Sequence, residues 1–144
     1  MRAIFALLVA VGLLAANHSS AAEAKTAQLY KNPECGCCEQ YASVLRLSGF
    51  EVEVINTHDL PLIKRRHGVA ERYEGCHTTL VGGYVVEGHV PAGVIERLLK
   101  DRPAIKGVSL PGMPAGSPGM SGAKTEPFVI YEIGDGPARV YAVE

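Results

Sequence analysis

A strand ends and a helix begins within the stretch NPECGCC, residues 32–38. Asn32-Pro33 is a turn signal that ends the preceding strand, because proline has no backbone N–H to continue the ladder. Three thiols follow within four residues, at Cys35, Cys37 and Cys38. Apolar side chains then recur at helical spacing to about residue 48. This pattern predicts a helix that opens at Cys37 or Cys38 and directs its positive end at the sulfur atoms.

A second sulfur-bearing segment lies further along the chain, where Cys76, the last cysteine, is followed at once by His77. A disulfide between the sequence neighbours Cys37 and Cys38 would be strained, and Cys35 can pair with only one partner. Complete pairing into structural disulfides therefore fits this spacing poorly. Thiolates are the soft ligands that select Cu(I), zinc or iron–sulfur centres. We expect the two segments to meet and form one thiolate-rich metal or redox site.

The rest of the chain predicts the order of the elements around this site. Alternating or β-branched runs indicate strands, and 3.6-residue spacing bounded by glycine or proline indicates helices. The expected elements are strands 27–31, 51–55, 78–81 and 84–87, and helices 39–48, 60–67 and one that opens near residue 91. This is the order of an α/β, thioredoxin-like single domain. In such a fold the loop before strand 78–81 packs beside the start of the first helix, which places Cys76 next to the other three cysteines.

Residues 102–125 differ in composition from the segments before them. They are rich in proline, glycine and serine and contain Met113 and Met120, which predicts a long irregular loop that is functional or mobile. The runs 128–133 and 139–143 then predict a closing β-hairpin. The sequence shows neither an internal repeat nor a second domain.

The N-terminus has the form of a secretory signal. An apolar run over residues 3–16 follows Arg2, and the small residues Ser20 and Ala22 suit a signal-peptidase site. We expect a signal peptide over residues 1–22 and a domain over residues 23–144, with no membrane anchor, because the apolar run is shorter than the roughly 20 residues that span a bilayer. Loss of Arg2 changes the formal net charge from −1 to −2, which excludes nucleic-acid binding through bulk positive charge.

Four motifs carry a resemblance to a known family. They are YKNPECGCC (30–38), GCHT (75–78), GGYVVEGHVP (82–91), and LPGMP with GSPGM (110–114 and 116–120). In this order, over nearly the whole chain after residue 22, they resemble the exported CopG-type proteins, a thioredoxin-like family linked to copper resistance in bacteria. The resemblance implies periplasmic binding of copper, with other periplasmic copper-handling proteins as partners. It also implies a multinuclear Cu(I)-thiolate cluster on the matched positions Cys35, Cys37, Cys38 and Cys76.

Charge balance favours copper over zinc, which is the alternative metal. Four thiolates around one Zn²⁺ leave a net charge of −2, whereas several bridged Cu(I) ions can neutralise the same sulfurs. The alternative function is a periplasmic thiol–disulfide oxidoreductase that uses Cys35 and Cys38, which stand in C-x-x-C spacing at a helix start. Cys37 would interfere with such a two-cysteine cycle. A redox activity of copper or of the thiols stays open, and the sequence assigns no catalytic residue.

Other residues are weaker candidates. His77 is a candidate ligand as the neighbour of a cysteine, and Met113 and Met120 are candidate thioether ligands from the long loop. We expect His89 to be a helix cap or a surface residue, and the basic run KRR (64–66) to be a solvated helix face. Placement at a helix start is expected to lower the pKa of the thiols and so favour the metal-ready thiolate.

Overall fold

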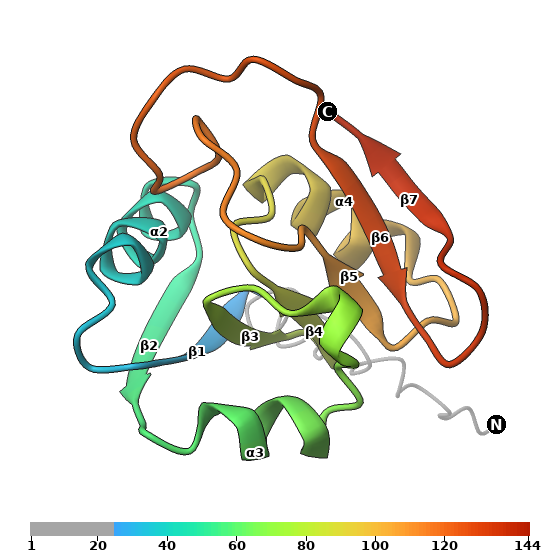
Figure 1. Ribbon diagram of the computed structural model, residues 1–144, viewed down its shortest axis with the longest axis horizontal. Coiled ribbons are helices and arrows are strands. Elements are labelled where there is room, and N and C mark those ends of the chain that lie inside the picture. Colours follow the sequence, from blue (N-terminus) through green and yellow to red (C-terminus); the bar gives the residue numbers. More distant parts are fainter. Residues whose placement is uncertain (1–24) are drawn as a thin grey trace, which may run out of the picture.

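The computed structural model describes residues 25–144, which form seven strands, three α-helices and one turn of 3-10 helix (Figure 1). The expected signal peptide, residues 1–22, lies outside the described residues and stays a prediction. Within residues 25–144 no helix has the length and apolar character needed to cross a membrane.

All seven strands belong to one mixed sheet with the order β2-β1-β3-β4-β5-β6-β7. Their bounds are β1 Thr26–Lys31, β2 Glu51–Asn56, β3 His77–Val81, β4 Tyr84–Glu87, β5 Gly107–Ser109, β6 Val129–Ile133 and β7 Val140–Val143. β1 is parallel to β2 and antiparallel to β3, so Lys31 at the end of β1 pairs with His77 at the start of β3. The loop that follows β1 and the segment that precedes β3 therefore lie side by side. This pairing brings Cys76 to the thiol loop.

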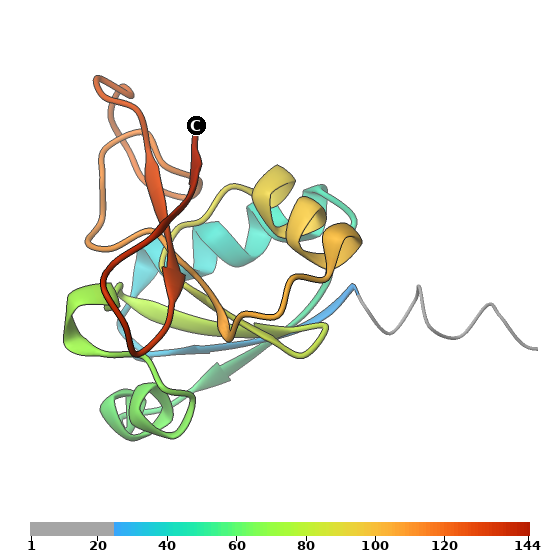
Figure 2. The same ribbon diagram turned by 90° about the vertical axis from the view of Figure 1, so that its right-hand side faces the viewer.

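Two helices cover one face of the sheet and a third covers the other (Figure 2). α2 (Gly36–Leu47) and α4 (Ala92–Asp101) lie together on one face, and α3 (Leu60–Arg66) lies opposite them. The helices that share a face bury apolar side chains against the sheet, namely Tyr41, Ala42 and Leu45 of α2 and Val94, Ile95 and Leu98 of α4. The short 3-10 helix η1 (Glu71–Tyr73) leads to the Cys76 segment.

The α/β fold class and the expected order of elements are confirmed, with differences at the boundaries. α2 begins at Gly36, earlier than expected, and Cys35 is its N-cap. β5 lies in the segment expected to be irregular. The sequence did not predict it, because a strand of three residues has too few positions to show an alternating pattern. It pairs in parallel with β4, and a Cβ at Gly107 would collide with the carbonyl group of Val85.

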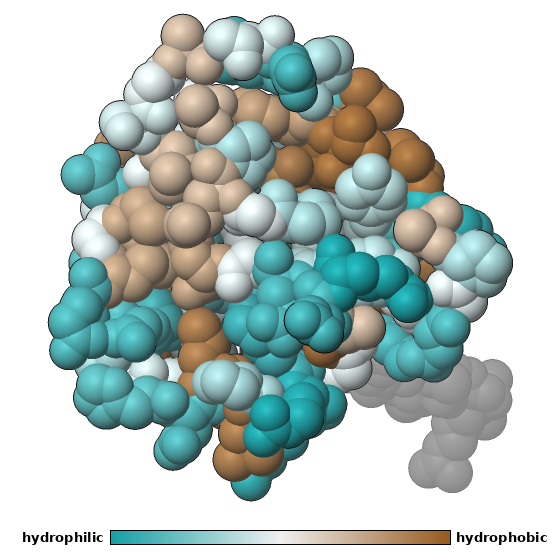
Figure 3. All heavy atoms as spheres, in the orientation of Figure 1, coloured by the Kyte–Doolittle hydropathy of each residue, from teal (hydrophilic) through white to brown (hydrophobic). Residues whose placement is uncertain are grey.

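The expected closing hairpin is formed by β6 and β7 at the edge of the sheet. Ile130 and Ile133 of β6 are buried, whereas Val140 and Val143 of β7 are 54% and 60% exposed. Figure 3 shows the resulting apolar surface over this hairpin. Ile130 belongs to the main core cluster and Ile133 to a second cluster with Tyr73 and Val85, so β6 extends the core while the edge strand β7 leaves apolar side chains exposed.

The long loop, residues 110–127, packs against the start of α2 rather than extending into solvent. Gly119 has a φ of +81°, and a Cβ at this position would lie 2.6 Å from the backbone nitrogen of Tyr41 and 3.0 Å from the carbonyl oxygen of Cys37. Ser117, which is 1% exposed, donates a side-chain hydrogen bond to the Pro114 carbonyl at 2.7 Å. The close approach at Gly119 places the loop beside the helix turn that carries the cysteines.

Candidate metal centre

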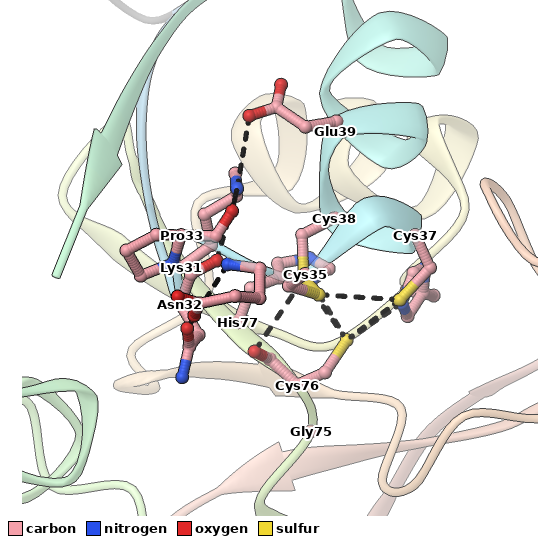
Figure 4. Close-up of a disulfide and its surroundings, with 12 residues drawn as sticks. Lys31, Asn32, Pro33, Cys35, Cys37, Cys38, Glu39, Gly75, Cys76 and His77 are labelled. Atoms are coloured by element: carbon pink, nitrogen blue, oxygen red, sulfur yellow. Dashed lines mark hydrogen bonds and ion pairs between the residues drawn. A yellow bond between two sulfur atoms is a disulfide. The ribbon is translucent and has the colours of Figure 1, made fainter. Parts of the chain in front are cut away.

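A buried lysine organises the thiol loop between β1 and α2. The Lys31 side chain is 1% exposed, and its Nζ donates hydrogen bonds to the carbonyl oxygens of Asn32 at 3.1 Å and Pro33 at 3.2 Å. The same ammonium lies 3.1 Å from Oε1 of Glu39 in the first turn of α2 (Figure 4). Because a buried charge needs polar partners, these contacts hold the end of β1 against the start of α2 and order the backbone before Cys35.

The four cysteine sulfurs meet at the N-terminus of α2 (Figure 4). Cys35 and Cys38 form a disulfide, while Cys37 and Cys76 are free thiols. The Sγ of Cys76 lies 3.6 Å from that of Cys38 and 3.9 Å from that of Cys37, and the Sγ atoms of Cys35 and Cys37 are 3.5 Å apart. All four sulfurs lie within 4.8 Å of one another. The structure therefore brings together the two cysteine segments that the sequence placed side by side.

The disulfide joins the C-x-x-C pair, and the other two cysteines stay reduced. This partial pairing agrees with the strain argument against complete pairing. It also means that four thiol ligands are present only after the disulfide is reduced, a step that takes two electrons and two protons from an external dithiol or similar reductant.

His89 is a component of the site that the sequence analysis missed. The expectation of a cap or surface residue is wrong, because the residue is fully buried and its Nε2 lies 2.9 Å from the Sγ of Cys76. Its Nδ1 lies 2.7 Å from the carbonyl oxygen of Pro118, so Nδ1 carries the proton and donates it. In a neutral ring Nε2 is then the acceptor for the Cys76 thiol. The long loop thus orients the histidine that contacts this cysteine.

The hairpin register contains a signal that could have found His89. Thr78 of β3 pairs with Glu87 of β4. Continuing this register by two residues beyond the paired strands places Cys76 opposite His89. The glycine pair at the turn is plain in the sequence, and a two-residue turn is enough to fix this pairing register.

His77 lies on the inner side of the centre and is fully buried. Its Nδ1 is 3.4 Å from the Sγ of Cys76, and its ring centroid is 4.5 Å from that of Tyr41 and 4.8 Å from that of His89. The Tyr41 hydroxyl donates to the carbonyl oxygen of Val90 at 2.8 Å, which fixes this aromatic wall. His77 Nε2 is buried without a hydrogen-bond partner among residues 25–144. Metal ligation by His77 stays a prediction.

The protonation of the site differs from the expectation. Burial raises the pKa of the Cys76 thiol to about 12, and the neighbouring Cys37 adds to this rise. The expectation of a lowered thiol pKa rested on placement at the helix start, and it is wrong for Cys76, where burial is the largest cause of the shift. Burial lowers the pKa of both His77 and His89, so both rings are neutral at pH 7. Cys76 therefore carries its proton at pH 7.

The two methionine candidates occupy different surroundings on the 110–127 loop. Met113 is 55% exposed. Met120 is half-buried and follows Gly119, the residue that touches the first turns of α2. Thioether ligation by either residue stays a prediction.

Comparison with known proteins identifies the family. The family described as "Protein of unknown function, DUF411" matches residues 73–120. A solved structure titled "Copper resistance protein copG- Form 1" is 35% identical, with a TM-score of 0.77, over 85% of this chain and 98% of that chain. The chain belongs to the CopG family. A second CopG structure, titled "Form 2", is also 35% identical, with a TM-score of 0.76, over 83% of this chain and 97% of that chain. A comparison with curated proteins finds no match.

The donor set of this CopG chain fits a soft metal ion. Two sulfurs bound to one ion at about 2.3 Å each cannot lie more than about 4.6 Å apart. The separations of 3.5, 3.6 and 3.9 Å between sulfurs that are not bonded to each other satisfy this limit. Thiolates prefer Cu(I) and zinc to hard cations, so copper binding is compatible with both the geometry and the chemistry of the site.

The copper affinity of this CopG chain is expected to rise with pH. Because the pKa of Cys76 is about 12, copper that binds this sulfur near pH 7 must displace its proton. Each displaced proton raises the affinity about tenfold per pH unit. Competition between the reduced protein and a Cu(I) chelator is measured at several pH values and corrected for the chelator's own protonation. It gives the slope of the logarithm of the copper affinity against pH. The Cys76→Ala variant should show a slope smaller by about one proton. An unchanged slope would contradict proton displacement from Cys76.

Proposed function

We propose that this protein binds Cu(I) through Cys35, Cys37, Cys38 and Cys76 as a multinuclear cysteine-thiolate cluster, and that it acts in copper resistance or homeostasis. The observation that carries the proposal is the convergence of the four sulfurs within 4.8 Å from two segments far apart in the chain. Membership of a family whose solved members are titled copper resistance proteins supports copper as the metal.

The spacing of the thiols supports several ions rather than one. Three cysteines in four residues crowd their sulfurs, and bridging sulfurs shared between ions tolerate such crowding better than a single tetrahedral ion does. Charge acts in the same direction. Four thiolates on one divalent ion leave a net charge of −2 beside a buried histidine pair, whereas several monovalent ions bring the site towards neutrality.

We also propose that residues 1–22 are removed on export and that residues 23–144 act in the periplasm, where other copper-handling proteins would supply or accept the ion. The apolar run with its small-residue cleavage site supports this location. Intact mass measured on protein from the periplasmic and the cytosolic fractions tests it. A chain that begins at residue 23 is expected, and a full-length chain in the cytosol would contradict the proposal.

A thiol–disulfide oxidoreductase is the second candidate, and the disulfide between Cys35 and Cys38 at the start of α2 favours it. The two extra thiols count against it. Cys37 lies 3.5 Å from the Sγ of Cys35, and Cys76 lies 3.6 Å from that of Cys38, so each disulfide sulfur has an internal thiol ready to compete with an external substrate.

Metal content and thiol titration separate these two functions. The protein is reduced, loaded anaerobically with Cu(I), freed of unbound metal, and assayed for copper per chain and for thiols that react with a chromogenic disulfide. The proposal expects more than one copper per chain and four protected thiols. Absence of bound copper, together with rapid exchange of the Cys35–Cys38 disulfide with a dithiol, would replace it with the oxidoreductase.

A further inference from the structure

A buried ion pair lies on the face of the sheet opposite α2, where α3 packs. It joins Lys64 of α3, which is 3% exposed, to Glu87 at the end of β4, which is fully buried. The expectation that residues 64–66 form a solvated helix face is therefore wrong for Lys64. Its partner is 23 residues away in the sequence, and local charge patterning does not show such a pairing.

Both members of the pair contact the backbone of Gly75, the residue before Cys76. Oε1 of Glu87 accepts the Gly75 N–H at 2.7 Å, and Nζ of Lys64 donates to the Gly75 carbonyl oxygen at 3.1 Å. The second carboxylate oxygen of Glu87 accepts the Thr78 hydroxyl at 2.7 Å. The pair therefore contacts the chain on both sides of the cysteine, through the backbone of Gly75 before it and the side-chain hydroxyl of Thr78 after it.

The backbone at Gly75 has little freedom of its own. A Cβ at this position would lie 2.6 Å from the Cα of Gly88, so the two chain segments touch directly. Gly75 lies two residues before the start of β3, and among residues 25–144 only an isolated bridge to Gly112 adds strand-like pairing there. The ion pair thus supplies hydrogen-bond partners that the regular pairing of β3 with β1 and β4 does not provide.

Stability alone is a weak reason for this arrangement. Removing two charges from water is costly, and well-packed apolar side chains in place of a buried ion pair often leave stability unchanged or higher. The apolar side chains would have no groups to bind the Gly75 peptide. What the ion pair provides, and apolar packing cannot, is a fixed position for the peptide that carries the cysteine.

We propose that Lys64 and Glu87 are positioning residues of the metal centre, which set the place of the Cys76 sulfur relative to Cys37 and Cys38. This inference rests on the proposed copper function. Neither residue is a ligand in it. They act through Gly75, and they correspond to the outer partners around metal sites whose loss typically lowers metal affinity about 10- to 100-fold.

The test compares Lys64→Met, Glu87→Gln, and the double variant Lys64→Met/Glu87→Met with the wild-type full chain. A Lys106→Ala variant is the control, because it removes a surface ion pair with Asp135. Lys64→Met leaves a buried carboxylate without its partner and should lower Tm by about 10 °C or more. The double variant should recover a Tm within about 5 °C of wild type. Its Cu(I) affinity should stay about tenfold or more below wild type, while the control keeps wild-type affinity.

A second readout uses no copper. The rate at which Cys76 is alkylated in the reduced, metal-free protein, resolved by peptide mass, should rise about fivefold or more in the double variant, because the segment that carries it is released. This rate decides the inference if the wild-type protein binds no copper, an outcome that would refute the proposed function separately. If the double variant does not fold, Lys64→Met, which removes the hydrogen bond to the Gly75 carbonyl oxygen, is judged by the same two readouts. Wild-type copper affinity and a wild-type alkylation rate in the folded variant would show that the pair is only structural and overturn the inference.

Discussion

The Cys76→Ser variant is expected to lose most of its bound Cu(I) while it keeps its fold. Cys76 is the one sulfur that comes from outside the α2 segment, and it lies within 3.9 Å of the sulfurs of both Cys37 and Cys38. Without it, the three remaining sulfurs occupy one helix turn and its cap and can surround an ion from one side only. Serine is close in size, and its hydroxyl can still donate to His89, so the packing around residue 76 should persist.

The loss of affinity should exceed the 10- to 100-fold range typical of changes outside the ligand shell, and copper per chain should fall by about half or more. Copper content after desalting and competition with a Cu(I) chelator measure both quantities, and Tm of the metal-free protein controls for folding. The same variant separates the two candidate functions. An oxidoreductase that uses Cys35 and Cys38 should retain dithiol exchange in this variant. Unchanged copper content would remove Cys76 from the site.

The Gly119→Ala variant is expected to destabilise the protein and loosen the metal centre together. A Cβ on a residue with φ of +81° costs about 1–2 kcal/mol by itself. Here it would also lie 2.6 Å from the Tyr41 backbone nitrogen. Because this overlap is with backbone, it is relieved only if the loop or the helix moves. We expect a loss of about 3 kcal/mol in the free energy of unfolding, because overlap with backbone adds to the conformational strain.

The same displacement should reach the copper site through Pro118, the residue before Gly119. Its carbonyl oxygen accepts the Nδ1–H of His89, so movement of the loop frees the ring that contacts Cys76. Urea denaturation and Cu(I) competition measure the two effects. Gly112→Ala is the matched control, because Gly112 lies in the same loop with φ of +73° and a Cβ there would meet no atom of residues 25–144 within 4 Å. Equal losses in both variants would show that the contact with α2 does not matter.

The order of strands and helices could be predicted because each element has its own local signal. The thiol loop, the α2 spacing and the glycine pair at the β3–β4 turn are all readable within about ten residues. The meeting of Cys76 with the other cysteines followed from topology, since β3 pairs with β1. The cysteine cluster was therefore predictable, because a single strand pairing is enough to bring its two segments together.

The features that escaped prediction depend on contacts that local sequence does not show. Burial of Lys64 requires Glu87, which reaches it from another element, and the position of His89 requires the hairpin register to be continued past the strand ends. The raised pKa of Cys76 comes from burial, whereas the expectation rested on the helix dipole alone. The sequence did not decide whether Cys35 and Cys38 form a disulfide, because both cysteines of this C-x-x-C pair could equally have been metal ligands.

X-ray absorption at the copper edge of the anaerobically loaded protein tests the central claim most directly, since it reports the atoms around the metal itself. The four-cysteine cluster predicts Cu(I) with a first shell of sulfur only, and a copper–copper distance short enough to require bridging sulfurs. A single copper with nitrogen in its first shell and no copper–copper scattering would contradict the cluster and shift the site towards Cys76 with His77 and His89, the other group of donors that lies together in this structure.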